Sequence, residues 1–148
     1  MITKNIKEID KEHFAKVDVH NLTISTKKSV EICNFIRNKN LNKTKSILTQ
    51  VLNKKIAVPV KRFNKDRAHK PGRGIAAGFY PIKTVQEFLR LLNSLEANAL
   101  QKGLDVNNLV VYYAISNQGP KVWHSGRQRR RKMKITHIEL RAKEREKK

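Results

Sequence analysis

The chain has 148 residues, enough for one domain of ordinary size, and 39% of them are hydrophobic, enough for one modest core. Lys and Arg total 33 against 12 acidic residues, and this net charge of +21 indicates a polyanionic partner, either a nucleic acid or an anionic membrane surface. One cysteine excludes an internal disulfide and a cysteine zinc cluster, and charged residues interrupt every apolar run that a signal peptide or a membrane span would need.

The N-terminal quarter of the chain predicts one strand and one helix after a polar extension over residues 1–14. Apolar residues alternate over residues 15–24, with a bulge expected near Asn21. Ser25 or Thr26 is a suitable N-cap for a helix that reaches about Arg37. The buried face of this helix is predicted to hold Val30, Cys33 and Ile36, flanked by Ile32 and Phe35.

A second helix and a long basic loop follow a short connection over residues 38–40. Asn42 is the expected N-cap of the helix, which runs to about Lys54, and Pro59 is expected to end regular structure. Residues 61–80 then form a loop rich in Lys, Arg and Gly, and loops of this length in compact domains tend to be functional or disordered. The helix is expected to bury Thr44, Ile47, Leu48, Val51 and Leu52.

The third helix is the longest predicted element, from Pro81 in or before its first turn to about Gln101. Gly103 is the expected residue after its C-cap, where a left-handed conformation ends a helix. Its apolar positions follow the helical period and form one buried stripe, namely Val85, Phe88, Leu89, Leu92, Leu95 and Ala99, widened by Leu91.

Two strands, over residues 109–116 and 135–140, are predicted to pair antiparallel because they are consecutive. The first has apolar residues on both faces, which suits a central strand, with Leu109, Val111, Tyr113 and Ile115 on one face. In the second, either Ile138 and Leu140 or the opposite face is buried. Residues 117–134 then form an extended ribbon that continues the pair beyond the body, and the residues from Arg141 onwards are expected to fray, with 145–148 as a charged tail.

Basic residues concentrate in the 61–83 and 121–134 segments, outside the amphipathic helices, which favours a nucleic acid over a membrane surface. An aromatic side chain in such a segment can stack on an unpaired base. For Tyr80, packing at the domain edge is the favoured interpretation; for Trp123, stacking and packing against the hairpin stay open. The basic residues are Arg62, Lys65, Arg67, Lys70, Arg73 and Lys83, then Lys121, Arg127, Arg129, Arg130, Arg131, Lys132 and Lys134.

Catalytic and metal-binding patterns are weak in this sequence. None of the five histidines has a recognised ligand spacing with Cys, Asp or Glu, so no metal or other cofactor is expected. The Gly72–Arg73–Gly74 segment is only half of a phosphate-binding loop. A nuclease that uses His69 or His124 is the remaining enzymatic hypothesis, and the absence of a complete catalytic constellation makes it the weakest.

Five short motifs in order resemble the archaeal and eukaryotic form of the twenty-second universal ribosomal protein family of the large subunit. The resemblance covers about residues 17–144 and is supported by Ser29–Ile32, Ile36–Arg37 and Val58–Val60. The motifs are His69–Arg73, Gly78–Lys83, Glu96–Ala99, Lys102–Asp105 and Thr136–Glu139.

The resemblance implies a small α+β body, in which three helices pack on a three-stranded antiparallel sheet and two strands extend into a long protruding β-hairpin. It places residues 15–144 in a single ribosomal-protein domain, with the hairpin arm at about 117–134. The implied protein sits in the cytoplasmic ribosome, binds large-subunit rRNA, aids its assembly and touches neighbouring large-subunit proteins. Its hairpin borders the nascent-peptide exit tunnel, although this arm is shorter than is usual for the family and lacks its Pro- and Gly-rich tip.

The same resemblance places Arg127 to Lys134 in the hairpin and Tyr80 in a loop that meets rRNA. Contact with the nascent peptide stays open because of the shorter arm. A free-standing RNA-binding protein, such as a chaperone or regulator, is the alternative that the charge alone permits. The further positions that the resemblance implies for rRNA binding are Lys121, Trp123 and His124 in the hairpin, and Lys70, Arg73 and Lys83 in the loop and the following helix start.

Overall fold

The computed structural model describes residues 14–72 and 74–145, which form the predicted α+β fold. Three long antiparallel strands make a sheet in the order β1-β6-β5, and the short strand β2 extends it at β5. A separate two-stranded sheet joins β3 and β4. The strands are β1 (Phe14–Leu22), β2 (Lys39–Asn40), β3 (Val58–Pro59), β4 (Gly78–Phe79), β5 (Leu109–Gln118) and β6 (Thr136–Glu144).

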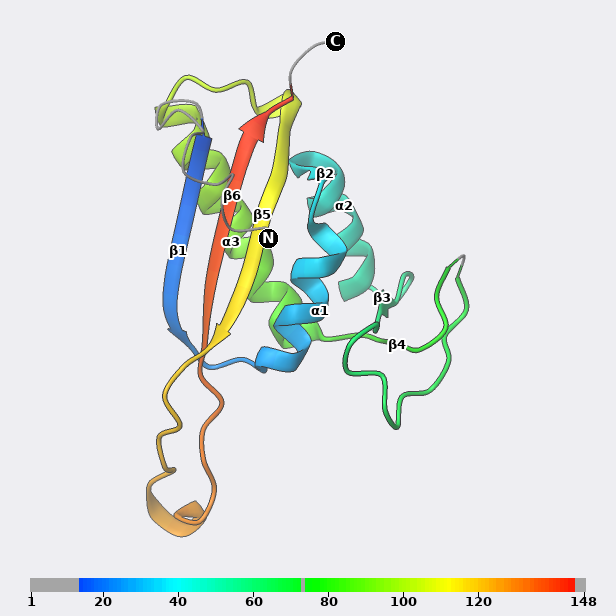
Figure 1. Cartoon of the computed structure of the whole chain (residues 1–148), viewed down its shortest axis with the longest axis vertical. Coiled ribbons are helices and arrows are strands. Elements are labelled where there is room, and N and C mark those ends of the chain that lie inside the picture. The colour runs from blue at the N-terminus through cyan, green and yellow to red at the C-terminus, as the bar shows by residue number, and fades with distance from the viewer. Residues whose placement is uncertain (1–13, 73, 146–148) are drawn as a thin grey trace, which may run out of the picture.

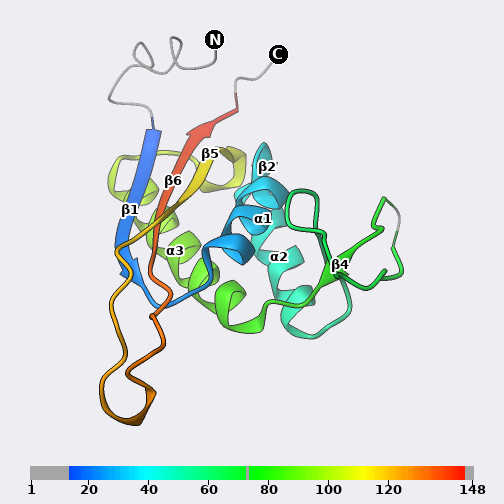
Figure 2. The ribbon, with the colours of Figure 1, turned by 60° about the horizontal axis from the view of Figure 1, so that its bottom comes forward.

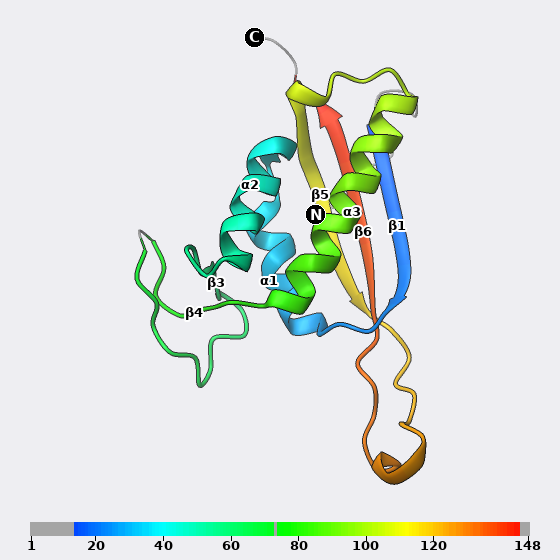
Figure 3. The same ribbon diagram turned by 180° about the vertical axis from the view of Figure 1, so that it is seen from behind.

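The three helices supply the other half of the core. Helix α3 crosses one face of the long strands, while α1 and α2 lie on the side of β5 (Figures 1 and 3). Alternate residues of β6, from Thr136 to Ala142, are buried against these helices, as the period of a half-buried strand requires. The helices are α1 (Thr26–Ile36), α2 (Leu41–Leu52) and α3 (Ile82–Gln101), and short 3₁₀ turns occupy Val106–Asn108 and Gly126–Gln128.

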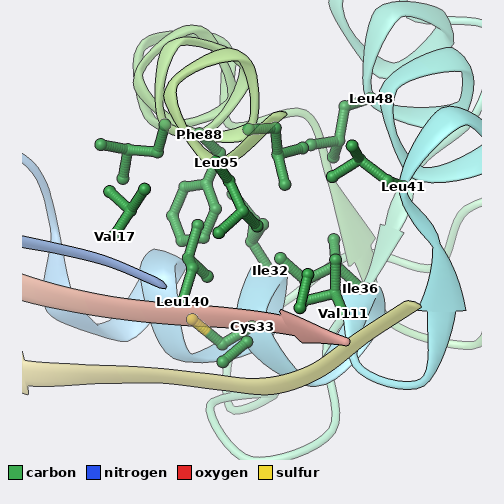
Figure 4. Close-up of a cluster of buried hydrophobic side chains, with 14 of the residues drawn as sticks. Val17, Ile32, Cys33, Ile36, Leu41, Leu48, Phe88, Leu95, Val111 and Leu140 are labelled. Atoms are coloured by element: carbon green, nitrogen blue, oxygen red, sulfur yellow. The ribbon is translucent and has the colours of Figure 1, made fainter. Parts of the chain in front are cut away.

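The core is one continuous cluster of apolar side chains between sheet and helices. Figure 4 shows Phe88 of α3 close to Leu140 of β6, and Ile36 of α1 close to Val111 of β5. Phe88, Leu140 and Val111 have no exposed surface. The predicted stripe of α3 is confirmed except at Leu89, which is half-buried, and Gly103 ends the helix with φ +70.

Strand bulges place side chains differently from simple alternation. The predicted bulge of β1 is confirmed, because the register shifts between Val19 and Leu22 and Asn21 has φ +60. A second bulge shifts β5 between Val111 and Tyr113. The expectation that Tyr113 shares the face of Leu109 and Val111 was therefore wrong: Ala114 takes the next buried position and Tyr113 is half-buried.

Several local expectations were also wrong at the first two helices. The cap of α2 is Asn40 rather than Asn42, since the Asn40 side chain accepts hydrogen bonds from the amides of Asn42 and Lys43. The connection before it contains β2, which pairs with Val110 and Val111 of β5. On α1 the buried face turns away from Val30 towards the row of Ser29, Ile32, Cys33 and Ile36, so Val30 is half-buried.

Two chain segments are more regular than the sequence predicts. Pro59 does not end regular structure but lies in β3, paired with Gly78. Proline is tolerated there because β3 has only one partner strand, so a missing N–H costs no ladder bond. Strand β6 continues to Glu144 because residues 141–143 pair with β1 and β5 on both sides and Glu144 pairs with Leu109 of β5, so these residues do not fray.

The arm over residues 117–134 projects past the end of the sheet (Figures 1 and 2). The Gly119 amide donates to the Ile135 carbonyl at 2.9 Å and the Met133 amide to the Val122 carbonyl at 2.7 Å. Near the tip, the His124 amide donates to the Arg131 carbonyl at 2.9 Å. The expected projecting ribbon is thus confirmed as an irregular hairpin with few cross-strand bonds.

Candidate nucleic-acid interface

The tip of the arm carries the densest positive charge on the described surface. Between Asp105 and Glu139 the sequence has no carboxylate, so nothing within the arm neutralises its cations. Gly126 has φ +69 and opens the 3₁₀ turn that reverses the chain. The arm cations are all exposed, and four of them line an open hollow of about 550 Å³ beside Gly126, namely Arg127, Arg129, Arg130 and Arg131.

Trp123 lies halfway along the arm and presents its ring to solvent. It is 56% exposed and bridges to Lys132 on the opposite side of the hairpin. The Lys132 ammonium lies over the ring, 4.4 Å from its centroid. One contact of the ring is therefore made within the hairpin, and over half of the residue's surface stays free for stacking on an unpaired base.

The loop over residues 61–80 is anchored at its root by a buried carboxylate. Glu31 of α1, 2% exposed, accepts hydrogen bonds from the backbone amides of Lys61, Arg62 and Phe63 at 3.1, 2.9 and 2.9 Å. Backbone groups therefore take about three of the four acceptor sites of the carboxylate. The basic side chains of the loop have no salt bridge within the described residues.

Several cations of this loop rest on aromatic rings. The Arg67 guanidinium lies 5.5 Å from the centroid of Phe79, and the Lys70 ammonium lies 5.8 Å from that of Tyr80. Tyr80 itself is half-buried and packs against the core, so packing at the domain edge is confirmed for this residue. Arg62, Lys65, Arg67 and Lys83 are exposed and Lys70 is half-buried, while Arg73 falls outside the described residues.

The two basic segments do not converge on one spot. The arm continues the sheet, whereas the 61–80 loop projects from the far side of α1 (Figures 1 and 2). The folded body therefore separates them, and one nucleic acid could touch both only by passing across the molecule.

Sequence reasoning missed two residues that position these segments. Glu31 is part of one short motif in the sequence, and the signal that could have found it is that it is the sole carboxylate of this helix. The second residue is Gly119 at the root of the arm, which no local sequence pattern marks. A Cβ there would lie 2.5 Å from Cγ2 of Ile135 and 3.1 Å from Nε2 of His137, so only glycine fits without a shift.

Chemistry other than binding finds little support in the described part of the chain. No cluster of three or more His, Cys, Asp or Glu side chains could hold a metal ion there, and His69 and His124 are both exposed. Burial raises the pKa of the Cys33 thiol to about 12, which makes it inert. Among these residues, no helix combines the length and hydrophobicity needed to cross a bilayer.

Comparison with known proteins gives a consistent result. The family model described as ribosomal protein L22p/L17e matches residues 17–143. The large ribosomal subunit protein uL22 of Methanoculleus marisnigri is 43% identical over 114 residues, which cover 75% of this chain and 73% of that protein. The uL22 protein of Nanoarchaeum equitans is 38% identical over 87% and 78% of the two chains, and that of Cenarchaeum symbiosum 34% identical over 91% and 92%.

Proposed function

The chain belongs to the ribosomal protein L22p/L17e family, and from this premise we propose how it works as a structural constituent of the large ribosomal subunit. Its partners are large-subunit rRNA and neighbouring ribosomal proteins, and it is not an enzyme. The cytoplasm, where the ribosome works, is its proposed location. The alternative of a free-standing RNA-binding protein is not favoured, because its relatives are named as large-subunit proteins over most of the chain.

The observation that carries the mechanism is the exposed arm, which has seven cations and no carboxylate. Like charges held on a thin hairpin repel one another, and the few backbone bonds across the arm oppose this only weakly. RNA phosphates remove the repulsion and release condensed counterions. We expect the arm to gain its full order on rRNA rather than in the free protein.

The arginines at the tip are better suited to binding RNA phosphates than lysines would be. A guanidinium forms two parallel hydrogen bonds to a phosphate and also stacks on a base. Trp123 offers a second stacking surface, whose contribution is about 1–3 kcal/mol for each base. The arm residues proposed to contact rRNA are Lys121, Trp123, His124, Arg127, Arg129, Arg130, Arg131, Lys132 and Lys134.

The 61–80 loop and the start of α3 supply the second proposed contact. Glu31 holds the root of the loop to α1. The point from which the exposed loop cations extend is therefore fixed relative to the arm. Contacts with phosphate fix position without reading sequence, and the shape of the folded rRNA therefore sets specificity. The residues proposed here are Arg62, Lys65, Arg67, Lys70, Arg73, Tyr80 and Lys83.

The binding mechanism is tested by neutralising the tip in the full-length protein. In R129Q/R130Q/R131Q we expect the affinity for large-subunit rRNA to fall, and the slope of log affinity against log salt to flatten by about 2–3, one for each lost phosphate contact. The melting temperature should not fall, because the tip packs against nothing in the body. Fluorescence anisotropy at several salt concentrations measures both quantities.

Competition separates the two functional hypotheses. Excess unrelated RNA should displace the wild-type protein poorly from large-subunit rRNA if several shaped contacts hold it. Ready displacement by any RNA would favour a general RNA-binding protein. An unchanged salt slope in the triple variant would exclude the arm as the contact surface.

A finer part of the proposal is that the tip of the arm borders the nascent-peptide exit tunnel. The family resemblance supports it, and so does the projection of the arm beyond the body (Figure 2). A photo-crosslinker at Gln128 in translating ribosomes should capture rRNA and nascent chain together. Crosslinks to rRNA alone would show that the arm stops short of the tunnel.

A further inference from the structure

We propose that a pocket between α1, β2 and the root of the 61–80 loop binds one phosphodiester group of the RNA backbone, separately from the arm and from the cations further along that loop. It is a concave site of about 230 Å³. Its cations are Arg37 at the C-terminus of α1, Lys39 in β2 and Lys61 beyond β3. The proposal rests on the RNA-binding function proposed above and adds a site on the body to it.

The Arg37 side chain is held by a hydrogen bond, and the backbones of the two lysines are fixed. Nη2 of Arg37 donates to the carbonyl of Ala114 in β5 at 2.7 Å, which leaves the other guanidinium donors available. Lys39 is fixed by the pairing of β2 with Val111 of β5, and its ammonium lies 3.6 Å from the centroid of Phe35. The Lys61 backbone is tied to the Glu31 carboxylate at 3.1 Å. A fixed backbone lowers the entropy that is lost when an anion binds, while the exposed Lys61 side chain is ordered only on binding.

The charge of the pocket is not balanced from within. Glu31 is its one acidic wall residue, and that carboxylate already accepts three backbone hydrogen bonds. The salt bridges of the described residues join Lys16 to Asp18, Lys45 to Glu96 and Arg90 to Glu87, all outside the pocket. Three cations against one occupied carboxylate leave an excess of positive charge, which a phosphate would neutralise.

The ionisation of Lys39 supports this view. Burial, together with the positive charges of Lys43 and Lys61, holds the pKa of the Lys39 ammonium below its usual range. A neighbouring anion would relieve the part of this effect that comes from the two cations. An RNA phosphate is the occupant that the +21 chain and its family favour over an acidic peptide.

The test compares three full-length variants. K39Q/K61Q removes two of the pocket cations, K54Q/K55Q removes two exposed lysines outside the pocket, and K39R/K61R keeps the charge. We expect K39Q/K61Q to lose about tenfold in affinity for large-subunit rRNA and to flatten the salt slope by about 1. The other two variants should stay within about threefold of the wild-type affinity. Equal behaviour of K39Q/K61Q and K54Q/K55Q would overturn the proposal.

A second measurement does not depend on rRNA and so separates this proposal from the proposed function. Dimethyl phosphate, a phosphodiester without sugar or base, is titrated at constant ionic strength while NMR follows the amides of Arg37, Lys39 and Lys61. A saturable shift in the wild-type protein that is lost in K39Q/K61Q is expected, whatever the arm variants do with rRNA. No shift would overturn the proposal.

Inorganic phosphate serves as the comparison ligand in the same titration. Saturable binding of inorganic phosphate without binding of dimethyl phosphate would assign the pocket to a free ion and overturn the RNA assignment. If K39Q/K61Q does not fold, Lys61→Gln alone replaces it, because the Lys61 side chain is exposed and only its backbone bonds to Glu31. That variant should lose the dimethyl phosphate shift of the amide at position 61 and about threefold in rRNA affinity.

Discussion

Individual buried polar side chains hold the basic segments of this protein in position through hydrogen bonds. Glu31 is the main example, because one carboxylate holds three consecutive backbone amides at the root of the 61–80 loop. Thr136 plays a similar part near the arm: its hydroxyl donates to the carbonyl of Ile24 at 2.9 Å and shares a hydrogen bond of 2.8 Å with the Thr26 hydroxyl. Neither role follows from residue type or periodicity, since both bonds join residues far apart in the chain.

Removal of the Glu31 carboxylate should destabilise the body. Glu31→Ala leaves three amides without their charged acceptor, and we expect a loss of about 2–4 kcal/mol in the free energy of unfolding, measured in urea. Glu31→Gln keeps one acceptor oxygen and should lose less. Glu87→Ala removes the same charge from a helix surface, where its partner Arg90 is 77% exposed, and should cost under about 1 kcal/mol. Equal effects at the two positions would contradict the anchoring role.

Cys33 should be almost unreactive in the folded protein. With a pKa of about 12, roughly one thiol in ten thousand is ionised at pH 8, and burial blocks access as well. We expect modification by Ellman's reagent at pH 8 to be over a thousandfold slower than in the urea-unfolded chain. Because the folded pKa is raised, the stability contributed by the neutral thiol is complete below about pH 8.5 and is lost as pH rises towards 12. Rapid stoichiometric labelling of the native protein would contradict its placement in the core.

At the scale of elements, continuous patterns were predictable and short tertiary pairings were not. The stripe of α3 and the strand pair around the arm follow from local periodicity, and both are confirmed. The two-residue strands β2, β3 and β4 form only because distant chain segments pair, so no local sequence pattern predicts them. The bulge in β5 was hidden because the residues on either face of that strand are apolar, and a change of phase leaves the pattern unaltered.

The same contrast applies to the candidate site, in which the exposed arm was predictable from the sequence and the pocket was not. A run of arginines without carboxylates predicts an exposed arm from charge alone, and the structure shows these side chains exposed. The pocket at Arg37, Lys39 and Lys61 was not predictable, because its cations are single residues from separate elements. Only the pairing of β2 with β5 and the bonds of Glu31 bring them together.

The direction of the arm depends on close packing at its root. An alanine at Gly119 would press against Ile135, so Gly119→Ala should cost about 1–3 kcal/mol and loosen the bonds between the two sides of the arm. Faster hydrogen exchange of the Met133 amide, which donates to Val122, would report this loosening. Gly103→Ala adds its Cβ to open space outside the arm, at a φ of +70 that strains it, and should leave that amide unchanged even though it costs stability. The same exchange rate in wild type and Gly119→Ala would show that the root is not tightly packed.

At the scale of the whole molecule, a small rigid body carries two separate basic projections and a cationic pocket between α1 and β3. Their spacing is set by the core and not by the charges, which would drive them apart. A protein of this kind can tie together RNA segments that are remote in sequence. This follows from the arrangement of the projections, whereas the identity of the RNA follows from family membership.

The central claim is that the chain is held in the large ribosomal subunit through its basic arm. The most direct test is sedimentation of a lysate from cells that express tagged wild-type protein or the R129Q/R130Q/R131Q variant. We expect the wild-type protein in the large-subunit and whole-ribosome peaks, and a smaller share of the variant there with more at the top of the gradient. Wild-type protein that stays at the top, or a variant that enters the subunit as fully as the wild type, would contradict the account.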